Sequence, residues 1–160
     1  MPVRITPRGT RGSTFFDMPP GLKGIFVAIN VAFYRLIGRR IKIQGRPLLL
    51  LTTVGAKTGK RRQAALAWFD DDPPREGTWL IVASKGGSAT HPGWYLNLAR
   101  RPKDTTIEVD GKTVAVEPES LDGPERERAW ARIVARAPGY GAYEVTTDRE
   151  IPVVRLTRRA

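Results

Sequence analysis

The sequence contains no cysteine and a single histidine, His91, among its 160 residues. Without cysteine the chain can form neither a disulfide framework nor a thiolate metal site. One histidine argues against a histidine-based metal cluster and against a Ser/His/Asp hydrolase triad. The first residues also lack the charged, apolar and small-residue series of a secretion signal. We therefore expect a cytoplasmic protein that binds no metal.

Acidic residues are scarce in the first part of the chain. Residues 1–62 contain 13 Lys or Arg and one acid, Asp17, whereas residues 63–160 contain 14 Lys or Arg and 15 acids. The net charge of +11 therefore arises in the first part, which attracts nucleic acid, anionic lipid or a multiply charged small anion. That part lacks the aromatic and cationic alternation of a single-strand platform and any recognisable recognition helix, so we expect no nucleic acid partner.

The chain is long enough for one domain with its own core. Residues 1–20 are rich in Pro, Gly, Ser, Thr and Arg, which is typical of a flexible basic arm. Residues 21–40 place apolar side chains at the spacing of a helical face, but their apolar part is too short to span a bilayer. Because cations follow, residues 21–46 suit an anionic membrane surface; packing on the core or in a dimer interface suits the helix equally.

Residues 41–160 combine short strands with isolated helices. Strands are predicted for IKIQ, RPLLLLTTV, QAALAWF, TWLIVAS and IPVVRLT, and a hairpin around Asp110-Gly111. Helices are predicted for the segment between Pro92 and Pro102 and for DGPERERAWARIVARAP, where Asp122 and Glu125 fit a capping box. GYGAYEVTTDRE is predicted to be a tyrosine-bearing loop. The pattern favours a mainly β, α+β domain: a closed or split β-barrel with helices over its openings.

The stretch GAKTGKRR, residues 55–62, invites comparison with the phosphate loop of nucleotide hydrolases. Its glycines enclose three residues rather than four, Lys60 is followed by Arg61 rather than Ser or Thr, and a strand rather than a helix comes next. We therefore do not expect nucleoside triphosphate hydrolysis. Two interpretations remain: a basic hairpin turn, or an oxyanion site formed by backbone amides with the side chains of Lys57, Thr58 and Arg62.

A second cationic, glycine-rich segment follows the strand TWLIVAS. Ser84 supplies a hydroxyl group and Lys85 a cation, and the next two glycines allow a ligand to approach the backbone closely. The aromatic segment GWYLNL comes shortly afterwards. Each feature alone is a weak signal, but together they predict two cationic loops at strand ends and one aromatic helix.

The stretches LLLTTVGAKTGKRR, VASKGG, HPGWYLNLARRP and YGAYEVTTDREIPV, in this order, resemble the deazaflavin-dependent nitroreductase and quinone reductase family from about residue 48 to residue 154. The resemblance implies a split β-barrel of the FMN-binding type and a membrane-associating N-terminal helix. It implies coenzyme F-420, an 8-hydroxy-5-deazaflavin with a phosphate and an oligoglutamate tail, as the cofactor. Flavin mononucleotide, also a planar ring with a phosphate, is the alternative.

The resemblance also implies a set of cofactor-binding positions on three loops, two strands and one helix. Those facing the phosphate and tail are Lys57, Thr58, Arg62 and Lys85. The complete set is Ala56, Lys57, Thr58, Arg62, Gln63, Ala64, Ala65, Leu66, Ala67, Val82, Ala83, Ser84, Lys85, Gly93, Trp94, Tyr95, Leu96, Asn97 and Tyr140. Catalytic roles fall on Ser84 and Tyr140 as hydrogen-bond or proton donors, and on Tyr143 in the same tyrosine-bearing loop.

The implied reaction is hydride transfer from the reduced deazaflavin to a quinone or a nitro-type acceptor. Ala67 and Ala137 stand where the family has larger residues, which would widen the acceptor side and put activity on bulky nitroimidazoles in doubt. His91 is interpreted as a surface or helix-capping residue. A non-catalytic protein that binds a cofactor or a lipid is the alternative function, and a nucleic-acid-binding basic domain rests on charge alone. Nothing in the sequence indicates an oligomeric state.

Overall fold

Strand β2, Arg46–Val54, is buried on both faces in the computed structural model, which describes residues 2–37, 42–43 and 46–160. Successive side chains of a strand point to opposite faces. Leu49 and Leu51 accordingly belong to the cluster inside the barrel, whereas Leu48 and Leu50 pack under the first helix. The continuous apolar run of the sequence therefore forms the central strand, as predicted.

The described strands form one antiparallel sheet in the order β3-β2-β5-β6-β7-β4, and the short strand β1 also pairs with β2. A single bridge between Phe69 and Leu80 joins the region after β3 to β4 and brings the two ends of the curled sheet together. The sheet is thus the predicted split barrel. The bounds are β1 Lys42–Ile43, β3 Arg61–Ala67, β4 Thr78–Val82, β5 Thr106–Val109, β6 Lys112–Ser120 and β7 Val153–Arg158.

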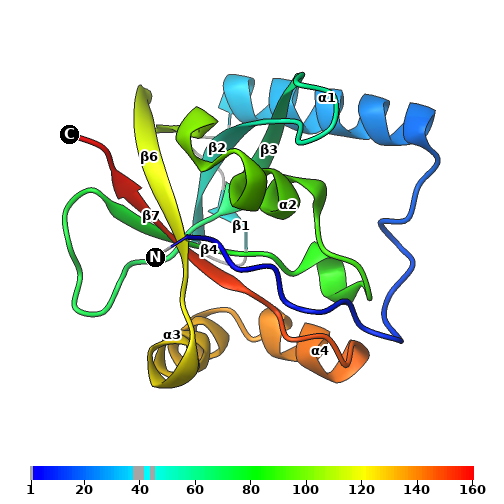
Figure 1. Ribbon diagram of the computed structural model, residues 1–160, viewed down its shortest axis with the longest axis vertical. Coiled ribbons are helices and arrows are strands. Elements are labelled where there is room, and N and C mark those ends of the chain that lie inside the picture. The colour runs from blue at the N-terminus through cyan, green and yellow to red at the C-terminus, as the bar shows by residue number, and fades with distance from the viewer. Residues whose placement is uncertain (1, 38–41, 44–45) are drawn as a thin grey trace.

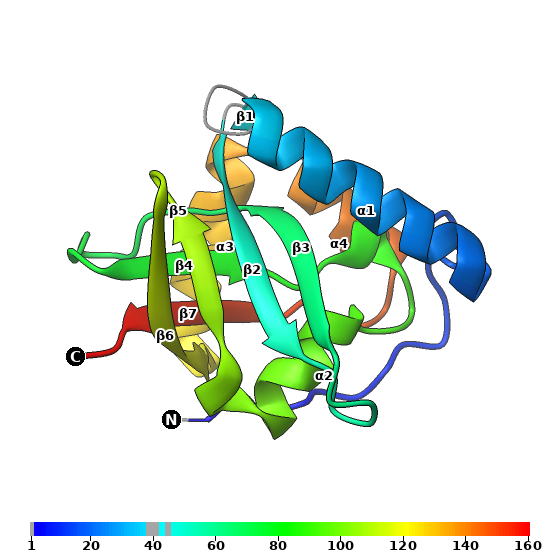
Figure 2. The same cartoon turned by 90° about the horizontal axis from the view of Figure 1, so that it is seen from above.

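The helices cover the outside and the openings of this barrel. Helix α1 lies over β2 and β3, α2 packs against the same two strands, and α3 and α4 lie together at the opposite end from α1 (Figure 1). Seen from above, β3 runs between α1 and α2 (Figure 2). The bounds are α1 Pro20–Ile37, α2 Gly93–Arg100, α3 Gly123–Arg136, α4 Gly139–Thr146, and the 3-10 turns η1 Lys85–Gly87 and η2 Pro102–Asp104.

The hairpin between β5 and β6 has the predicted two-residue turn. Val109 pairs with Lys112, and the two residues between them have positive φ angles, 50° at Asp110 and 76° at Gly111. Two positive φ values define the type I′ turn, whose twist matches that of the flanking strands. The Asp-Gly pair therefore sets the register of this hairpin.

The predicted capping box of α3 is wrong in its side-chain contacts. Asp122 occupies the N-cap position, but its side chain makes no capping hydrogen bond. The Glu125 carboxylate instead accepts a hydrogen bond from the Arg155 guanidinium, which also donates to Asp71 and Glu119. Because Arg155 is almost fully buried, Glu125 is drawn to it and fixes the start of α3 to β7.

The tyrosine-bearing segment is a helix, α4, rather than the predicted loop. Two glycines in its first turn lower its intrinsic helix propensity. Packing compensates, because Gly141 has no side chain and lets α4 approach α3: a Cβ there would lie 3.2 Å from Val134. The indole of Trp130 in α3 donates a hydrogen bond of 2.9 Å to Glu144 in α4. Tertiary contacts therefore decide the structure of this segment.

The segment predicted to be a mobile arm lies against the barrel. It runs between α2 and the α3–α4 pair before it turns toward α1 (Figure 1). The amide of Gly9 donates to the carbonyl of Ala89 at 2.8 Å, and that of Ser13 donates to the carbonyl of Gly87 at 3.0 Å. The Asp148 carboxylate accepts hydrogen bonds from the amide and hydroxyl groups of Thr10. We call residues 2–19 the N-terminal strap.

Helix α1 turns most of its apolar surface away from the barrel. Val31 and Tyr34 are buried on the sheet, and the Tyr34 hydroxyl donates a hydrogen bond of 2.9 Å to the carbonyl of Glu108. The larger apolar face is exposed, so packing of that face on the core of the same chain is excluded. By length and composition alone, the 18 residues of α1 meet the lower limit for a membrane span, with a mean hydropathy of 1.3. The exposed apolar residues of α1 are Leu22, Ile25, Phe26, Ile29, Phe33, Leu36 and Ile37.

Candidate cofactor site

The turn between β2 and β3 is closed by its own backbone. The amide of Gly55 donates to the carbonyl of Lys60 at 2.8 Å, and the amide of Gly59 donates back to the carbonyl of Gly55 at 2.9 Å. Gly55 leaves room for the Thr58 hydroxyl, because a Cβ there would lie 2.5 Å from its oxygen. Four exposed cations lie in this turn and at the start of β3, and none of them forms an ion pair within the described residues. They are Lys57, Lys60, Arg61 and Arg62. We call these four residues the basic turn.

Asn97 attaches the basic turn to helix α2. Its side-chain oxygen accepts a hydrogen bond of 3.0 Å from the amide of Ala56, and its side-chain nitrogen donates to the hydroxyl of Thr53 at 3.1 Å. Both partners belong to the end of β2 or the residues after it. Asn97 therefore links the first glycine-rich loop to the aromatic helix α2. Of the three segments predicted to form the site (two glycine-rich loops and this helix), these two are in contact.

Strand β3 forms the surface between α1 and α2. Ala65 and Ala67 pack toward α1, whereas Leu66 packs toward the barrel interior. Gln63 donates a hydrogen bond of 3.2 Å to the Thr52 hydroxyl, and its oxygen lies 3.5 Å from the Arg35 guanidinium of α1. Arg35 thus adds a cation beside the strand that sequence reasoning did not assign to the site.

The second glycine-rich loop, Ser84–Gly87, has an unusual backbone. The φ angles of Lys85, Gly86 and Gly87 are all positive, at 45°, 61° and 79°. A positive φ is unfavourable for a lysine and persists only where the surroundings impose it. The Lys85 ammonium donates to the Thr90 hydroxyl at 2.8 Å and to the Asp17 carboxylate at 3.0 Å.

The N-terminal strap covers this loop. The ring of Phe16 lies so close to Gly86 that a Cβ there would be 2.5 Å from a ring carbon. Together with Asp17, the strap therefore occupies the surface that the resemblance assigns to the cofactor phosphate. Two small hollows of the described structure lie elsewhere, against α3, with cavity volumes of only about 10 and 20 Å³. The candidate site is thus a strapped surface rather than a closed cavity.

Arg149, which the sequence analysis missed, lies beneath the same loop. Its guanidinium donates to the carbonyls of Ala83, Ser84 and Ser88 at 3.1, 2.9 and 3.0 Å. It also lies 3.0 Å from Nδ1 of His91. No local pattern in TTDRE predicts these contacts, because the partners lie about 60 residues away.

His91 was expected to be a surface or helix-capping residue, and it is neither. It is half-buried, stacks against Tyr95 with ring centroids 4.9 Å apart, and the helix N-cap is Pro92. Its Nε2 lies 2.7 Å from the carbonyl of Thr6. Burial, opposed in part by the Thr6 hydrogen bond, lowers the pKa of His91.

Helix α4 contacts the loop through Tyr143, and Tyr140 lies three residues earlier in the same helix. The backbone of Tyr143 lies against Gly87, where a Cβ would be 3.3 Å from it. The Tyr140 ring packs edge-on against Tyr143 and Phe69, with centroid separations of 5.6 Å in both cases. Burial, and then the neighbouring Tyr143, raise the pKa of Tyr140 to about 12. Tyr140 is therefore a neutral hydrogen-bond donor at physiological pH.

Several residues that the resemblance assigns to the ring present no side-chain surface to a ligand. Tyr95 is fully buried and its hydroxyl donates to the carbonyl of Arg4; both backbone groups of Ala83 have partners, Pro152 and Arg149. Nor do the two alanines that were expected to widen the acceptor side line an open surface, because larger neighbours pack around both. The buried residues in question are Ala67, Val82, Ala83, Tyr95 and Ala137.

The remaining assigned positions are at least partly accessible. They lie on the first loop, along β3, on the second loop, on α4, and on the face of α2 that includes its exposed first residue, Gly93. Trp94 and Leu96 are half-buried against the interior cluster, which leaves part of each at the surface. These accessible positions are Ala56, Lys57, Thr58, Arg62, Gln63, Ala64, Ala65, Leu66, Ser84, Lys85, Gly93, Trp94, Leu96, Asn97, Tyr140 and Tyr143.

Comparison with known proteins identifies the family. A profile of the F420H(2)-dependent quinone reductases matches residues 26–158. The chain is 42% identical over 137 residues to an F420H(2)-dependent quinone reductase of Mycobacterium tuberculosis, which covers 82% of this chain and 89% of that protein. A putative F420H(2)-dependent quinone reductase of the same organism is 34% identical over 113 residues, which is 71% of this chain and 91% of that protein.

Solved structures agree with the profile. An F420-H2-dependent reductase superimposes with a TM-score of 0.59 and 38% identity, covering 69% of this chain and 94% of that one. A structure described as a domain-swapped dimer superimposes with a TM-score of 0.60 and 32% identity, covering 81% of this chain and 96% of that one. By fold and by sequence, this chain belongs to the F420H(2)-dependent quinone reductase family of split-barrel oxidoreductases.

Proposed function

We propose that this protein binds reduced coenzyme F-420 on the surface between the basic turn, α2 and the Ser84–Gly87 loop, and transfers hydride to a quinone. The observation that carries the proposal is the basic turn, whose exposed cations lack ion-pair partners among the described residues and which Asn97 holds against α2. Charged surface groups left without ion-pair partners suit a polyanionic ligand.

The chain's own residues fit the three chemical parts of this cofactor. The basic turn suits the carboxylates of the oligoglutamate tail, and Lys85 with the glycine backbone beside it suits the phosphate. The half-buried alanines of β3 and the accessible side of α2 offer a flat, mostly apolar surface for a planar ring. The bound coenzyme would supply the hydride.

The protein's contribution is alignment and proton management. Quinone reduction requires one hydride and one proton, and the oxyanion that forms in between must be stabilised. Ser84 is the first residue of the loop that follows β4, and Tyr140 keeps its proton because its pKa is about 12. We assign to them hydrogen-bond donation toward the acceptor oxygen. Tyr140 passes a proton to it directly or through water, and Tyr143 supports Tyr140 by ring packing.

A parallel titration with oxidised F-420 and flavin mononucleotide tests the cofactor assignment. We expect F-420 to bind tighter, because flavin mononucleotide lacks the oligoglutamate tail that the basic turn would hold. Turnover is then measured with reduced F-420 and a menaquinone analogue. Tight binding without oxidation would favour the non-catalytic binding protein, and preference for flavin mononucleotide would overturn the assignment. Steeply salt-dependent binding to random DNA, with no affinity for either ring, would favour the nucleic-acid-binding domain instead.

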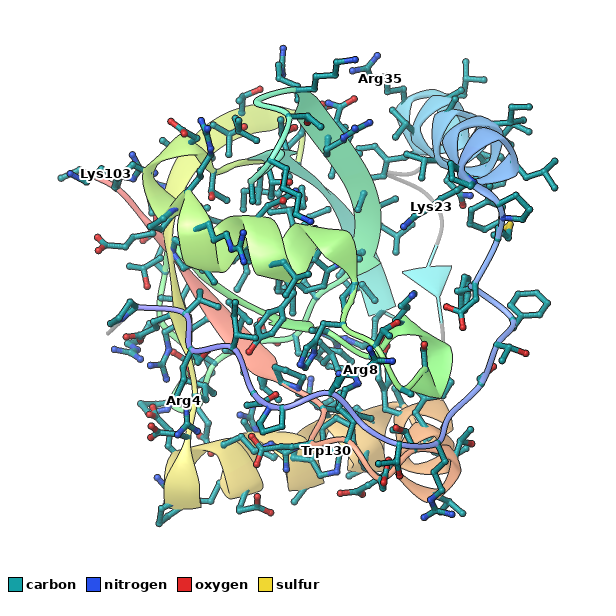
Figure 3. All side chains as sticks on the ribbon, turned by 45° about the vertical axis from the view of Figure 1, so that its right-hand side comes forward. Arg4, Arg8, Lys23, Arg35, Lys103 and Trp130 are labelled. Carbon is teal, nitrogen blue, oxygen red and sulfur yellow. The ribbon has the colours of Figure 1, made fainter. Side chains whose placement is uncertain are left out.

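We also propose that α1 places the protein on the inner face of the cell membrane. Its exposed apolar side chains follow a helical spacing that forms one long stripe, and the same helix carries the cations Lys23 and Arg35, labelled in Figure 3. An apolar stripe with flanking cations is the composition of helices that lie in the interface of anionic bilayers. The cationic cluster at residues 39–40 lies outside the described residues. A location at the membrane would bring the site close to lipid-soluble quinones.

A further inference from the structure

A single buried side chain supports the second glycine-rich loop from below. Arg149 is 3% exposed and lies in the connection between α4 and β7. Its hydrogen bonds reach the carbonyls of Ala83 and Ser84, at the start of the loop, and the carbonyl of Ser88, after its end. One planar, rigid guanidinium therefore holds both ends of the loop at once.

The loop needs this support because its backbone is unfavourable. Lys85 has a φ of 45°, a conformation that costs free energy for any residue with a side chain. If the guanidinium were absent, the buried carbonyls of Ala83 and Ser84 would lose their side-chain donor. The backbone could then relax, and it would move the Ser84 hydroxyl and the Lys85 ammonium with it.

The same guanidinium also fixes the start of α2. It donates to Nδ1 of His91, so that nitrogen carries no proton. The Nε2 proton of His91 is then donated to the carbonyl of Thr6 in the N-terminal strap. Arg149 thus connects the second loop, the start of the aromatic helix and the strap, three elements that border the candidate site.

Arg149 differs from the other buried arginines in its partners. Arg155 is compensated by Asp71, Glu119 and Glu125, whereas no carboxylate lies within ion-pair distance of Arg149 in the part of the chain that the structure describes. Burial without a counter-charge is costly and lowers the pKa of Arg149. A fixed, uncompensated positive charge therefore lies beneath the loop, where an anionic ligand would benefit from it.

We propose that Arg149 is a positioning residue for the cofactor, because it sets the backbone of the Ser84–Gly87 loop and supplies uncompensated positive charge under the place of the cofactor phosphate. This inference rests on the proposed function of the same site. Arg149 acts through Ser84 and Lys85 and does not itself touch the ligand. Its side chain is instead engaged with backbone carbonyls and His91.

The variants Arg149→Met and Arg149→Lys test this role, with Arg126→Met as the matched control. Arg126 is also buried and also donates to a carbonyl of the α4–β7 connection, that of Ile151 at 2.7 Å, but it stacks on Trp130 in α3 and makes no recorded contact with the loop. The measurements are the Kd of oxidised F-420, kcat/KM with reduced F-420, and thermal unfolding.

We expect Arg149→Met to lower kcat/KM by about 100-fold, since displacement of aligned groups by an ångström has an effect of this size. Arg149→Lys should restore part of the loss, because the ammonium keeps the charge and can reach one or two of the carbonyls. Both Arg149→Met and Arg126→Met should lower the unfolding temperature. Arg126→Met should nevertheless leave the Kd of F-420 within about twofold of wild type, as expected for a buried change remote from the ligand.

Nuclear magnetic resonance of His91 provides an independent readout, since it is the only imidazole in the chain. In the wild type we expect the neutral form with the proton on Nε2. Arg149→Met should remove the donor to Nδ1 and raise the pKa of His91, whereas Arg126→Met should leave both unchanged. A general loss of stability would not produce this difference.

Three results would overturn the inference. The first is wild-type affinity and turnover in both folded Arg149 variants. The second is an equal loss of affinity in Arg126→Met. The third is failure of Arg149→Lys to fold, which would assign Arg149 to the stability of the whole barrel. If the wild type neither binds nor oxidises the coenzyme, the proposed function itself fails, and the inference fails with it.

Discussion

The Asp17 carboxylate lies 3.0 Å from the Lys85 ammonium, so the only acid among residues 1–62 neutralises one of the cations proposed to hold the cofactor. The ammonium is 16% exposed and the carboxylate 45% exposed. An ion pair this open to solvent is weak, worth about 0.2 to 1 kcal/mol. A phosphate that carries more charge can therefore displace the carboxylate.

We predict that Asp17→Asn lowers the Kd of F-420 by up to about fivefold, because the ligand no longer has to break the Asp17–Lys85 ion pair. The amide removes the competing charge and preserves the size of the side chain. Asp148→Asn serves as the control, because Asp148 also binds the strap but contacts Thr10 and Arg11 rather than Lys85. Equal tightening in both variants would attribute the effect to release of the strap instead of to charge competition.

The basic turn offers a second prediction, because its cations should act together on the tail. The double variant Lys57→Gln and Arg62→Gln should weaken F-420 binding by about tenfold, from two exposed charge pairs. It should also make the Kd less dependent on salt. Lys112→Gln is the control: Lys112 lies at the β5–β6 hairpin, which the pairing of β5 with β2 places at the opposite end of β2. No change in salt dependence would argue against the tail site.

Tyr140 should influence turnover more than binding. We predict that Tyr140→Phe lowers kcat with a quinone by about 100-fold, the usual lower range for loss of a proton donor. Because burial raises the pKa of Tyr140 to about 12, the wild-type rate should show no alkaline decline from its ionisation below pH 10. The control is Tyr34→Phe, which removes a different tyrosine hydroxyl: that of Tyr34 donates to the carbonyl of Glu108 under α1. A normal kcat in Tyr140→Phe would remove the tyrosine from the proton path.

His91 should make the free energy of unfolding depend on pH in the mildly acidic range. Its folded pKa is lowered from the ordinary value of 6.5, with burial as the largest cause. The unfolded state therefore binds the proton more readily, so this stabilisation is complete above pH 6.5 and is lost as the pH falls through the folded pKa.

The substitution His91→Gln separates the charge of the ring from its hydrogen bonds. The amide can accept from Arg149 and donate to Thr6 but cannot titrate. Denaturant unfolding from pH 7 down to pH 5 should show a smaller loss of stability in the variant than in the wild type. Parallel curves for the two proteins would show that His91 does not titrate in this window.

Much of the barrel could be predicted from local patterns. The apolar run of β2, the Asp-Gly turn and the amphipathic spacing of α3 each depend on neighbouring residues, and each was found in its expected place. The contact of the first glycine-rich loop with α2 agrees with the resemblance and is made by Asn97, whereas the cofactor-binding roles of these positions stay a prediction.

The features that sequence reasoning missed depend on contacts between distant segments. The strap lacks regular structure and is held by Gly87, Ala89 and Asp148, so no periodicity marks it. Arg149 is indistinguishable from a surface arginine until the fold places three carbonyls around it. The large apolar face of α1 was a candidate for core packing, whereas Val31 and Tyr34 are the residues that meet the sheet.

The exposed face of α1 gives a further prediction. The double variant Ile29→Glu and Phe33→Glu should reduce binding to anionic vesicles by about 100-fold, since two large apolar side chains would no longer enter the bilayer interface. Val145→Glu, which changes an exposed apolar residue on α4, should have no such effect. If wild-type protein ignores the vesicles and elutes as a dimer that the double variant disrupts, a second copy rather than lipid covers α1.

The pairing of β3 has a consequence for solubility. Among the described residues, β3 pairs with β2 alone, and only the Phe69–Leu80 bridge beyond its end meets β4. Its other edge therefore presents backbone donors and acceptors that a strand of another molecule could extend. Charged residues at such an edge act as gatekeepers against aggregation. Arg61 and Arg62 lie at the start of β3. Their charges disfavour pairing of this edge with a strand of another molecule, and they also attract an anion.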